Sequence, residues 1–425
     1  MTDEGAPNIK DSRMPIISWA LYDWGSTAFP TSVVVSFFPV FFKTYWAGPE
    51  VLDRSTFYLG LANSIAGIIL ALLAPFLGVV ADKGSAKKKF LAFFAFLGII
   101  MTVALYFVSM GNWALAVFFY VLASLGYSGA NLFYDSLLLT IASKKKIDFV
   151  SLFGEALGFL GGGIAFAFSV VLYLYPHWFG VTDSQTAIRI SFLIVGIWWA
   201  LFSIPIMLFV KEPPSSRSSV TRSLSRDWKQ VRTTLGTIKQ YKSVGVFLLA
   251  YWLYIDGANT VSKMAVDYGV ALGFSPGSLV SAVLLVQFIS FPATLLYLYV
   301  VARIGAKGAV LVTISGYGLI SVLGYFIQKS WHLFALAILI ALFQGSIYAL
   351  SRSLYSRLIP FDKSTEFFGF YNVIGKFATI IGPLFVGLVT LLTHSNRIGI
   401  SSVIVFFMAG GWLLSMVDIK EGNSI

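Results

Sequence analysis

The stretch GVVADKGSAKKK, Gly78 to Lys89, decides the fold because a shorter copy of it, VVARIGAKG, stands 221 residues later at Val300 to Gly308. The same offset pairs Ala81 with Ala302, Gly84 with Gly305, Tyr127 with Tyr348, Asn131 with Arg352, Tyr134 with Tyr355, Gly154 with Gly375, Glu155 with Lys376 and Gly161 with Gly382. One register that holds over so much of the chain indicates an internal repeat. The sequence therefore predicts two halves of one design.

Composition and hydropathy place both halves in a membrane. Hydrophobic residues make up 57% of the 425 residues, charged residues 12%, and the mean hydropathy is +0.82, unlike a soluble domain. Alternating strands of about 10 residues, which a membrane barrel needs, are absent, so helices must satisfy the backbone. We predict an all-α membrane protein with twelve transmembrane helices in two six-helix bundles repeated in parallel. Each helix corresponds to an apolar stretch of about 20 residues, near residues 17–45, 57–80, 90–109, 113–142, 150–174, 187–210, 245–270, 277–302, 309–327, 333–356, 367–393 and 397–417.

A polar, basic linker joins the two bundles. We expect an N-terminal bundle over residues 1–210, a linker over 211–244 and a C-terminal bundle over 245–425. The second part of the linker is amphipathic, with apolar residues at helical spacing among lysines and arginines: Trp228, Val231, Leu235 and Ile238. We expect it to lie on the membrane surface as a helix. The alternative is a binding site for a soluble partner.

The net charge of +11 is a topology signal. When alternate loops are assigned to opposite sides, most lysines and arginines fall on the side that holds both chain ends. This asymmetry follows the positive-inside rule, so both termini are expected in the cytoplasm. We therefore expect no nucleic-acid partner. The polar N-terminus lacks an apolar core with a cleavage site, so no removable signal peptide is predicted.

Motifs of enzymes and metal sites are missing from the sequence. No glycine-rich phosphate loop ending in Lys-Ser or Lys-Thr is present, so the sequence gives no sign of an ATP-binding site that could drive transport. The absence of cysteine excludes disulfides and thiol catalysis. The three histidines, His177, His332 and His394, are isolated near the outer loops. We expect no enzymatic activity, no cofactor and no metal site.

Polar side chains recur at helical spacing in four predicted spans, the first, fourth, seventh and tenth. An ionisable side chain near the bilayer centre costs at least ~2.5–3.5 kcal/mol, so it needs a partner, water or a function. We predict that these stripes border a hydrated passage for substrate and protons, with Asp23, Asn131, Asp135, Asp256, Asn259, Tyr348 and Arg352 as its residues. The alternative for Asp23 is contact with interfacial water at its helix end. For Lys263 and Asp267, four residues apart, a local ion pair is the expected interpretation.

Glu155 and Lys376 occupy the same position in the two repeats. An axis normal to the membrane relates them, and residues near that axis can meet. We expect a salt bridge between them that closes the cytoplasmic side in one conformation. The alternative is that each pairs within its own half.

With these residues in view, the chain resembles the major facilitator superfamily. GVVADKGSAKKK is similar to that superfamily's signature of Gly, three residues, Asp, a basic residue, Gly and a basic cluster. The resemblance implies a gating role: Asp82 faces the N-terminal end of span eleven when the cytoplasmic side is shut, and Lys83 holds a neighbouring carboxylate or lipid phosphate. The second copy has Arg303 in place of the acid.

Within the superfamily, four segments resemble the bacterial "unknown major facilitator" family, whose fungal relatives are vacuolar effluxers that release amino acids during autophagy. The segments are WALYDWGSTAF, FLLAYWLYIDGANTV, SRSLYSRLIP and EFFGFYNVIGKFATIIGP. The resemblance implies a multi-pass protein of the bacterial cytoplasmic (inner) membrane. Asp135 and Glu155 depart from the family pattern and favour an added acidic function or a different substrate.

These features predict a secondary active transporter, a symporter or antiporter, that works by alternating access. Protons are the expected coupling ion, with Asp256 or Asp23 as the carrier, because burial favours a neutral carboxyl and a nearby cation favours the charged form. Asp256 and Arg352 together suit a zwitterion, which points to amino acids or similar small polar metabolites. The alternatives are an exporter of drugs or siderophores and a non-transporting sensor of the same fold. The expected partners are a small-molecule substrate, the coupling ion and lipid, and we expect a monomer.

Overall fold

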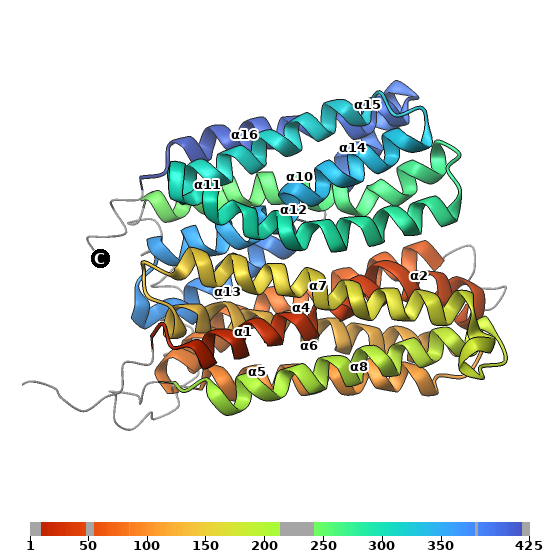
Figure 1. Ribbon diagram of the computed structural model, residues 1–425, viewed down its shortest axis with the longest axis horizontal. Helices are drawn as coiled ribbons and strands as arrows, with labels where there is room; N and C mark the ends of the chain where they lie inside the picture. The colour runs from red at the N-terminus through yellow and green to blue at the C-terminus, as the bar shows by residue number, and fades with distance from the viewer. Residues whose placement is uncertain (1–9, 48–54, 85, 213–241, 379–380, 419–425) are drawn as a thin grey trace, which may run out of the picture.

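The computed structural model describes residues 10–47, 55–84, 86–212, 242–378 and 381–418, and they form helices joined by short connections (Figure 1). The linker helix predicted near Trp228 lies outside these residues and stays a prediction. The side chains of Asp82, Lys83, Asp267 and Lys376 also lie outside the described part of the structure. The roles predicted for these four residues are therefore unchanged.

The first half begins with a span built of short helical pieces. α1 (Arg13–Ser26) is followed by a π-helical turn (Phe29–Phe37), α2 (Phe38–Phe41) and a second π-helical turn (Phe42–Trp46). Pro30 and Pro39 lack an N–H to donate, which favours such irregular turns. The next five spans are α4 (Ser55–Gly84), α5 (Lys87–Ala104), α6 (Trp113–Ile141), α7 (Ile147–Leu174) and α8 (Ser184–Phe209).

The second half starts with α10 (Lys242–Ala271) and α11 (Pro276–Gly324). Within α11, Gly305 has a φ of 74°, which a side-chain-bearing residue rarely adopts, so α11 is two spans that turn at this glycine. The chain then forms α12 (Ser330–Leu358), α13 (Ser364–Phe377), α14 (Ile381–Thr393), α15 (Asn396–Ser401) and α16 (Ile404–Ser415).

These helices account for the twelve predicted spans. Eight described segments are long and apolar enough to cross a membrane, judged by length and composition, and one of them is the double span α11. The remaining three spans are the interrupted first span, α4 and the pair α13 and α14. Leucines that face away from the protein, such as Leu72, Leu208 and Leu384, are exposed as a lipid-facing surface requires.

The spans form two bundles that meet along a central interface (Figure 1). Across it, α7 packs against α11 and α12, and α4 packs against α13. At the crossing of α4 and α13 the backbones touch, because a Cβ on Gly78 would lie 2.7 Å from the carbonyl oxygen of Thr365. The central interface therefore contains helices from both repeats, and it is where the candidate site lies.

Candidate functional site

A cavity of about 520 Å³ lies between the two bundles. The predicted residues Asp23, Asn131, Asp135, Glu155, Asn259, Tyr348 and Arg352 line it. Its walls continue to Phe274 and Ile327, which lie in the connections after α10 and α11. This is the end of the molecule away from the described chain ends. The cavity is therefore reached from one end, and its floor lies at Arg352.

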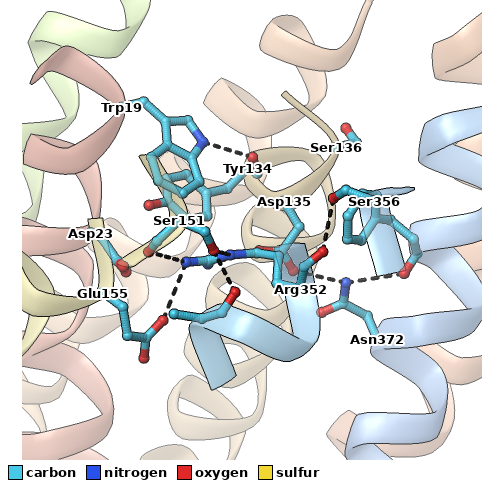
Figure 2. Close-up of polar contacts among 12 residues, drawn as sticks. Trp19, Asp23, Tyr134, Asp135, Ser136, Ser151, Glu155, Arg352, Ser356 and Asn372 are labelled. Atoms are coloured by element: carbon cyan, nitrogen blue, oxygen red, sulfur yellow. Dashed lines mark hydrogen bonds and ion pairs between the residues drawn. The ribbon is translucent and has the colours of Figure 1, made fainter. Parts of the chain in front are cut away.

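Arg352 is the centre of this floor and is bound mainly by the other bundle. Its guanidinium lies 3.1 Å from Asp135 Oδ1 and 3.3 Å from Glu155 Oε2. It also donates to the hydroxyl and carbonyl oxygens of Ser151, at 3.0 and 3.2 Å. Figure 2 shows the guanidinium between Asp135 and Glu155. One arginine of α12 thus holds side chains of both α6 and α7, with a planar fork that suits several acceptors at once.

Aromatic rings complete the surroundings of Arg352. The rings of Trp19 and Tyr134 stack at 4.2 Å, and the guanidinium carbon lies 5.0 Å and 5.6 Å from their centres. Trp19 also donates its indole N–H to the carbonyl oxygen of Tyr134 at 2.9 Å. The cation therefore has π-faces on one side and carboxylates on the other, an arrangement that stabilises a buried charge.

Asp23 joins this cluster from α1. Thr27 donates to its Oδ1 at 3.4 Å, and a Cβ on Gly158 would lie 3.1 Å from its carboxyl carbon. Asp23 interacts electrostatically with Arg352, Asp135 and Glu155. Asp23 lines the cavity, so its carboxyl group lies between the two halves.

The cluster carries more negative than positive groups. Among the described side chains, three carboxyl groups, those of Asp23, Asp135 and Glu155, surround the guanidinium of Arg352. If all three were ionised, these described groups would carry two unbalanced negative charges in a mostly buried site, which is costly. A proton or a cation bound at this floor would reduce the imbalance.

From Arg352 toward the end of the molecule that holds the described termini, further contacts join the two halves. Arg357 of α12 lies 2.5 Å from Asp148 of α7, which also accepts a hydrogen bond from Ser353. Lys87 donates to Ser364 at 2.6 Å, and its backbone N–H is bound by Glu212. We call this set of contacts, from Arg352 to Lys87, the closed end.

Asn372 extends the closed end to α13. Its amide donates to Asp135 Oδ2 at 3.2 Å and to the carbonyl oxygen of Phe368 at 3.0 Å. Asp135 is therefore held by α12 and α13 together. Sequence reasoning missed Asn372, Ser151 and the pair Asp148 with Arg357. A signal was present for two of them, because Ser151 and Asn372 are related by the same offset of 221 residues.

Tyr348 and Asn259 meet on the opposite wall of the cavity. The Tyr348 hydroxyl donates to Asn259 Oδ1 at 2.8 Å, and the Asn259 amide donates to the carbonyl oxygen of Ala378 at 3.1 Å. Both predicted residues thus line the cavity, and Asn259 also contacts span eleven through Ala378.

Asp256 is placed differently from expectation. Its side chain is 1% exposed, and it is absent from the described residues that line the cavity. Both of its carboxylate oxygens accept from the backbone N–H of Gly382, at 3.0 Å each. The polar stripe of α10 correctly predicted that this helix borders the cavity, but Asp256 in that stripe does not face the cavity. Lys263, on the same helix, is exposed and lines the cavity.

The described partner of Glu155 is Arg352 of the other half, and not the expected Lys376. Arg352 comes from α12, whereas Lys376 belongs to α13. Since the side chain of Lys376 is outside the described part, its pairing with Glu155 stays a prediction.

Comparison with known proteins identifies the family. The model of the family described as "Vacuole effluxer Atg22 like" matches residues 44–424. The chain belongs to this Atg22-like family. Among its relatives, the Bacillus subtilis (strain 168) protein named "Uncharacterized MFS-type transporter YxiO" is 36% identical over 416 residues, which are 96% of each chain. "Autophagy-related protein 22" of Yarrowia lipolytica is 29% identical over 304 residues, 64% of this chain and 50% of the relative.

Solved structures place this Atg22-like chain in the major facilitator fold. The human organic anion transporter MFSD10 has a TM-score of 0.74 at 13% identity, and covers 96% of this chain and 100% of its own. The proton:xylose symporter XylE bound to 6-bromo-6-deoxy-D-glucose gives 0.70 at 16%, with 96% and 98% covered. FucP in the outward conformation gives 0.67 at 14%, with 95% and 98% covered. The chain is a multi-pass membrane transporter of the major facilitator superfamily and not an enzyme.

Proposed function

We propose that this transporter moves a small solute with an ammonium group, an amino acid or a similar polar metabolite, by alternating access coupled to protons. The observation that carries the proposal is the acidic floor of the cavity, where three carboxyl groups meet one guanidinium. A site of this charge favours a cation or the ammonium end of a zwitterion.

Alternating access is supported by the distribution of contacts along the central interface. The closed end contains ion pairs and hydrogen bonds between the halves, whereas the other end holds the cavity. If the closed-end contacts break while the cavity walls near Phe274 and Ile327 come together, the same floor becomes accessible from the opposite side of the membrane. The lysines at the closed end, Lys87 and the run at residues 144–146, support a cytoplasmic position for that end.

The proposed binding mode differs from the pairing expected from sequence. The donors of Arg352 are already engaged by Asp135, Glu155 and Ser151, so Arg352 is a poor partner for the carboxylate of a substrate. Asp23 and Glu155 both line the cavity and can accept from an ammonium group. Lys263, on another wall, supplies a cation for the opposite end of a zwitterion.

The same two carboxyl groups are the proposed proton carriers. A proton on Asp23 or Glu155 reduces the excess negative charge, and arrival of an ammonium group would favour its release. The titratable groups that face them are Arg352 on α12, Asp135, Tyr134 and Tyr127 on α6, Tyr22 on α1 and Tyr348 on α12. Asp256 is the weaker candidate, because it lies outside the cavity lining.

A second candidate substrate is an organic cation with a bulky apolar group, exported as drugs are. The part of the cavity near its open end favours such a substrate, because apolar residues of the second half line it, among them Phe274, Leu279, Leu333, Leu336 and Ile340. Such a solute would place its charge at the same acidic floor.

Flux measurements on purified protein in proteoliposomes test these proposals. A thermal-shift screen of amino acids and organic cations selects the solute, and its uptake is then measured with and without a pH gradient. We expect the pH gradient to drive accumulation of the solute by the wild type. The variants Asp23→Asn and Glu155→Gln should still exchange solute across the membrane, but the pH gradient should not drive its accumulation. Asp183→Asn, an exposed helix cap far from the cavity where asparagine also caps well, is the control. A gradient without effect on the wild type would refute proton coupling.

A further inference from the structure

Four polar side chains from four different spans line the cavity between its acidic floor and its open end. They are Thr31 of the first span, Lys263 of α10, Gln287 of α11 and Gln344 of α12. We call these four residues the second level. Only Lys263 has a part in the proposed function, so the two amides and the hydroxyl group are polar groups of the cavity without an assigned role.

Two regular helices give the distance between the second level and the floor. On α12, Gln344 precedes Arg352 by eight residues. On α7, Gly163 follows Glu155 by eight residues, and a Cβ on Gly163 would lie 3.1 Å from the Cβ of Gln287. An α-helix rises about 1.5 Å per residue, so the second level lies about 12 Å from the floor along these helices.

Gln287 is held in place by the other half of the molecule. Its side-chain amide donates to the Thr31 hydroxyl oxygen at 2.7 Å, and Gln287 is only 7% exposed. Among the described contacts this is the one hydrogen bond of the Gln287 side chain. A buried amide without partners is costly. Its oxygen and its second N–H are therefore available to a solute in the cavity.

Lys263 and Gln344 belong to the same level. Asn259 and Tyr348 are hydrogen-bonded to each other, and Lys263 lies four residues beyond Asn259, while Gln344 lies four residues before Tyr348, each toward the open end. The Gln344 side chain has no hydrogen bond among the described contacts. Asp256 acts on Lys263 electrostatically, but no described ion pair joins them. One ammonium and two amides thus supply donors that suit a carboxylate.

The separation of the two levels selects solutes by their length. The ammonium and carboxylate groups of a single α-amino acid are attached to one carbon, so they cannot contact both levels. In an extended dipeptide the two ends are about 7 Å apart, and a hydrogen bond adds about 3 Å at each end. The resulting span of about 13 Å is close to the separation of the levels.

We propose that Gln287 and Gln344 are specificity-determining residues and that the cavity takes an extended zwitterion of dipeptide length. The ammonium group binds at the acidic floor, as in the proposed function on which this inference rests. The carboxylate binds Lys263 and the two amides of the second level. Thr31 positions the amide of Gln287 for this contact.

Thermal-shift titrations of the purified protein test the length preference with four ligands. They are glycine, diglycine, 5-aminopentanoate, which has as many bonds between its ends as diglycine but no peptide group, and pentylamine, which has the ammonium group alone. We expect diglycine and 5-aminopentanoate to bind at least about tenfold more tightly than the other two, because only they reach the second level with a charged group. Equal affinities would overturn this inference and leave the ammonium site of the proposed function standing. If none of the four binds, both are overturned.

Two variants assign the preference to the amides. Gln344→Leu removes no described contact and should keep the wild-type Tm, whereas Gln287→Leu loses the bond to Thr31. Each should reduce the advantage of diglycine over glycine to less than about threefold. Gln185→Leu, exposed on α8 and outside the described lining, is the control and should keep the full preference. A wild-type preference in both Gln344→Leu and Gln287→Leu would overturn the proposal.

Discussion

Arg352 connects the two halves of the transporter through buried charged contacts. Its helix belongs to the second half, while its acidic partners Asp135 and Glu155 belong to the first. Arg352 is 7% exposed, so these contacts are formed largely away from water. Removing one partner of a buried charge pair is much more costly than removing a surface pair. The closed end therefore depends on this residue more than on any single exposed lysine.

We predict that Arg352→Gln destabilises the protein by about 3–5 kcal/mol, because it leaves three carboxyl groups without their cation. Arg352→Lys keeps the charge but cannot contact Asp135, Glu155 and Ser151 at once, so it should lie between Gln and the wild type. Thermal unfolding in detergent, followed by uptake in proteoliposomes, checks both. Lys307→Gln, which removes a half-buried lysine that bonds only backbone carbonyls near the end of α16 in the described contacts, is the control. Equal stability of Arg352→Gln and the wild type would contradict the assignment.

Span eleven combines a proline with backbone contacts from another helix. Pro383 has no N–H and disfavours a continuous helix just before it. Side chains of α10 bind the backbone nearby: Asn259 donates to the carbonyl oxygen of Ala378, and Asp256 accepts from the N–H of Gly382. Apolar patterning predicts one continuous span near residues 367–393, because hydropathy does not report hydrogen-bond partners from another helix. The same limit explains Asp256: its place in the polar stripe is visible in the sequence, but the packing of α14 on it is not.

At this scale we predict that Gly382→Ala destabilises the protein by about 1–3 kcal/mol and reduces transport, because the added methyl group must displace Asp256 or Thr260. Gly387→Ala on the same helix, where a Cβ meets nothing within 4 Å, should be neutral. Parallel thermal unfolding of the two variants decides the point. If Gly382→Ala were as stable as the wild type, the close contact between α10 and α14 would not require glycine, which would contradict the prediction.

Over the whole molecule, the repeat explains which parts of the site the sequence could predict. Twelve spans and two bundles follow from hydropathy and the offset of 221 residues. That offset also relates Ser151 to Asn372, which meet Arg352 and Asp135 respectively. The pairing of Arg352 with Asp135 and Glu155 could not be predicted, because it depends on how the bundles dock.

A prediction about the docked bundles concerns Gly78. Gly78→Ala places a methyl group 2.7 Å from Thr365 O and should weaken the contact of α4 with α13, opening the closed end more often. Since the chain has no cysteine, a single Ser356→Cys can report this through labelling with a maleimide. Labelling should be slow alone and several-fold faster with Gly78→Ala. Gly67→Ala, on the same helix with nothing within 4 Å, is the control; equal labelling in both backgrounds would contradict the prediction.

The division of charge between the halves has a consequence for biogenesis. The acids of the closed end, Asp135, Asp148 and Glu155, are synthesised first, and the arginines that neutralise them, Arg352 and Arg357, leave the ribosome some two hundred residues later. Until then the nascent first half holds uncompensated carboxyl groups in the bilayer. A first half made without α12 lacks the arginine partners of these acids, so the closed end can form only after α12 has been synthesised.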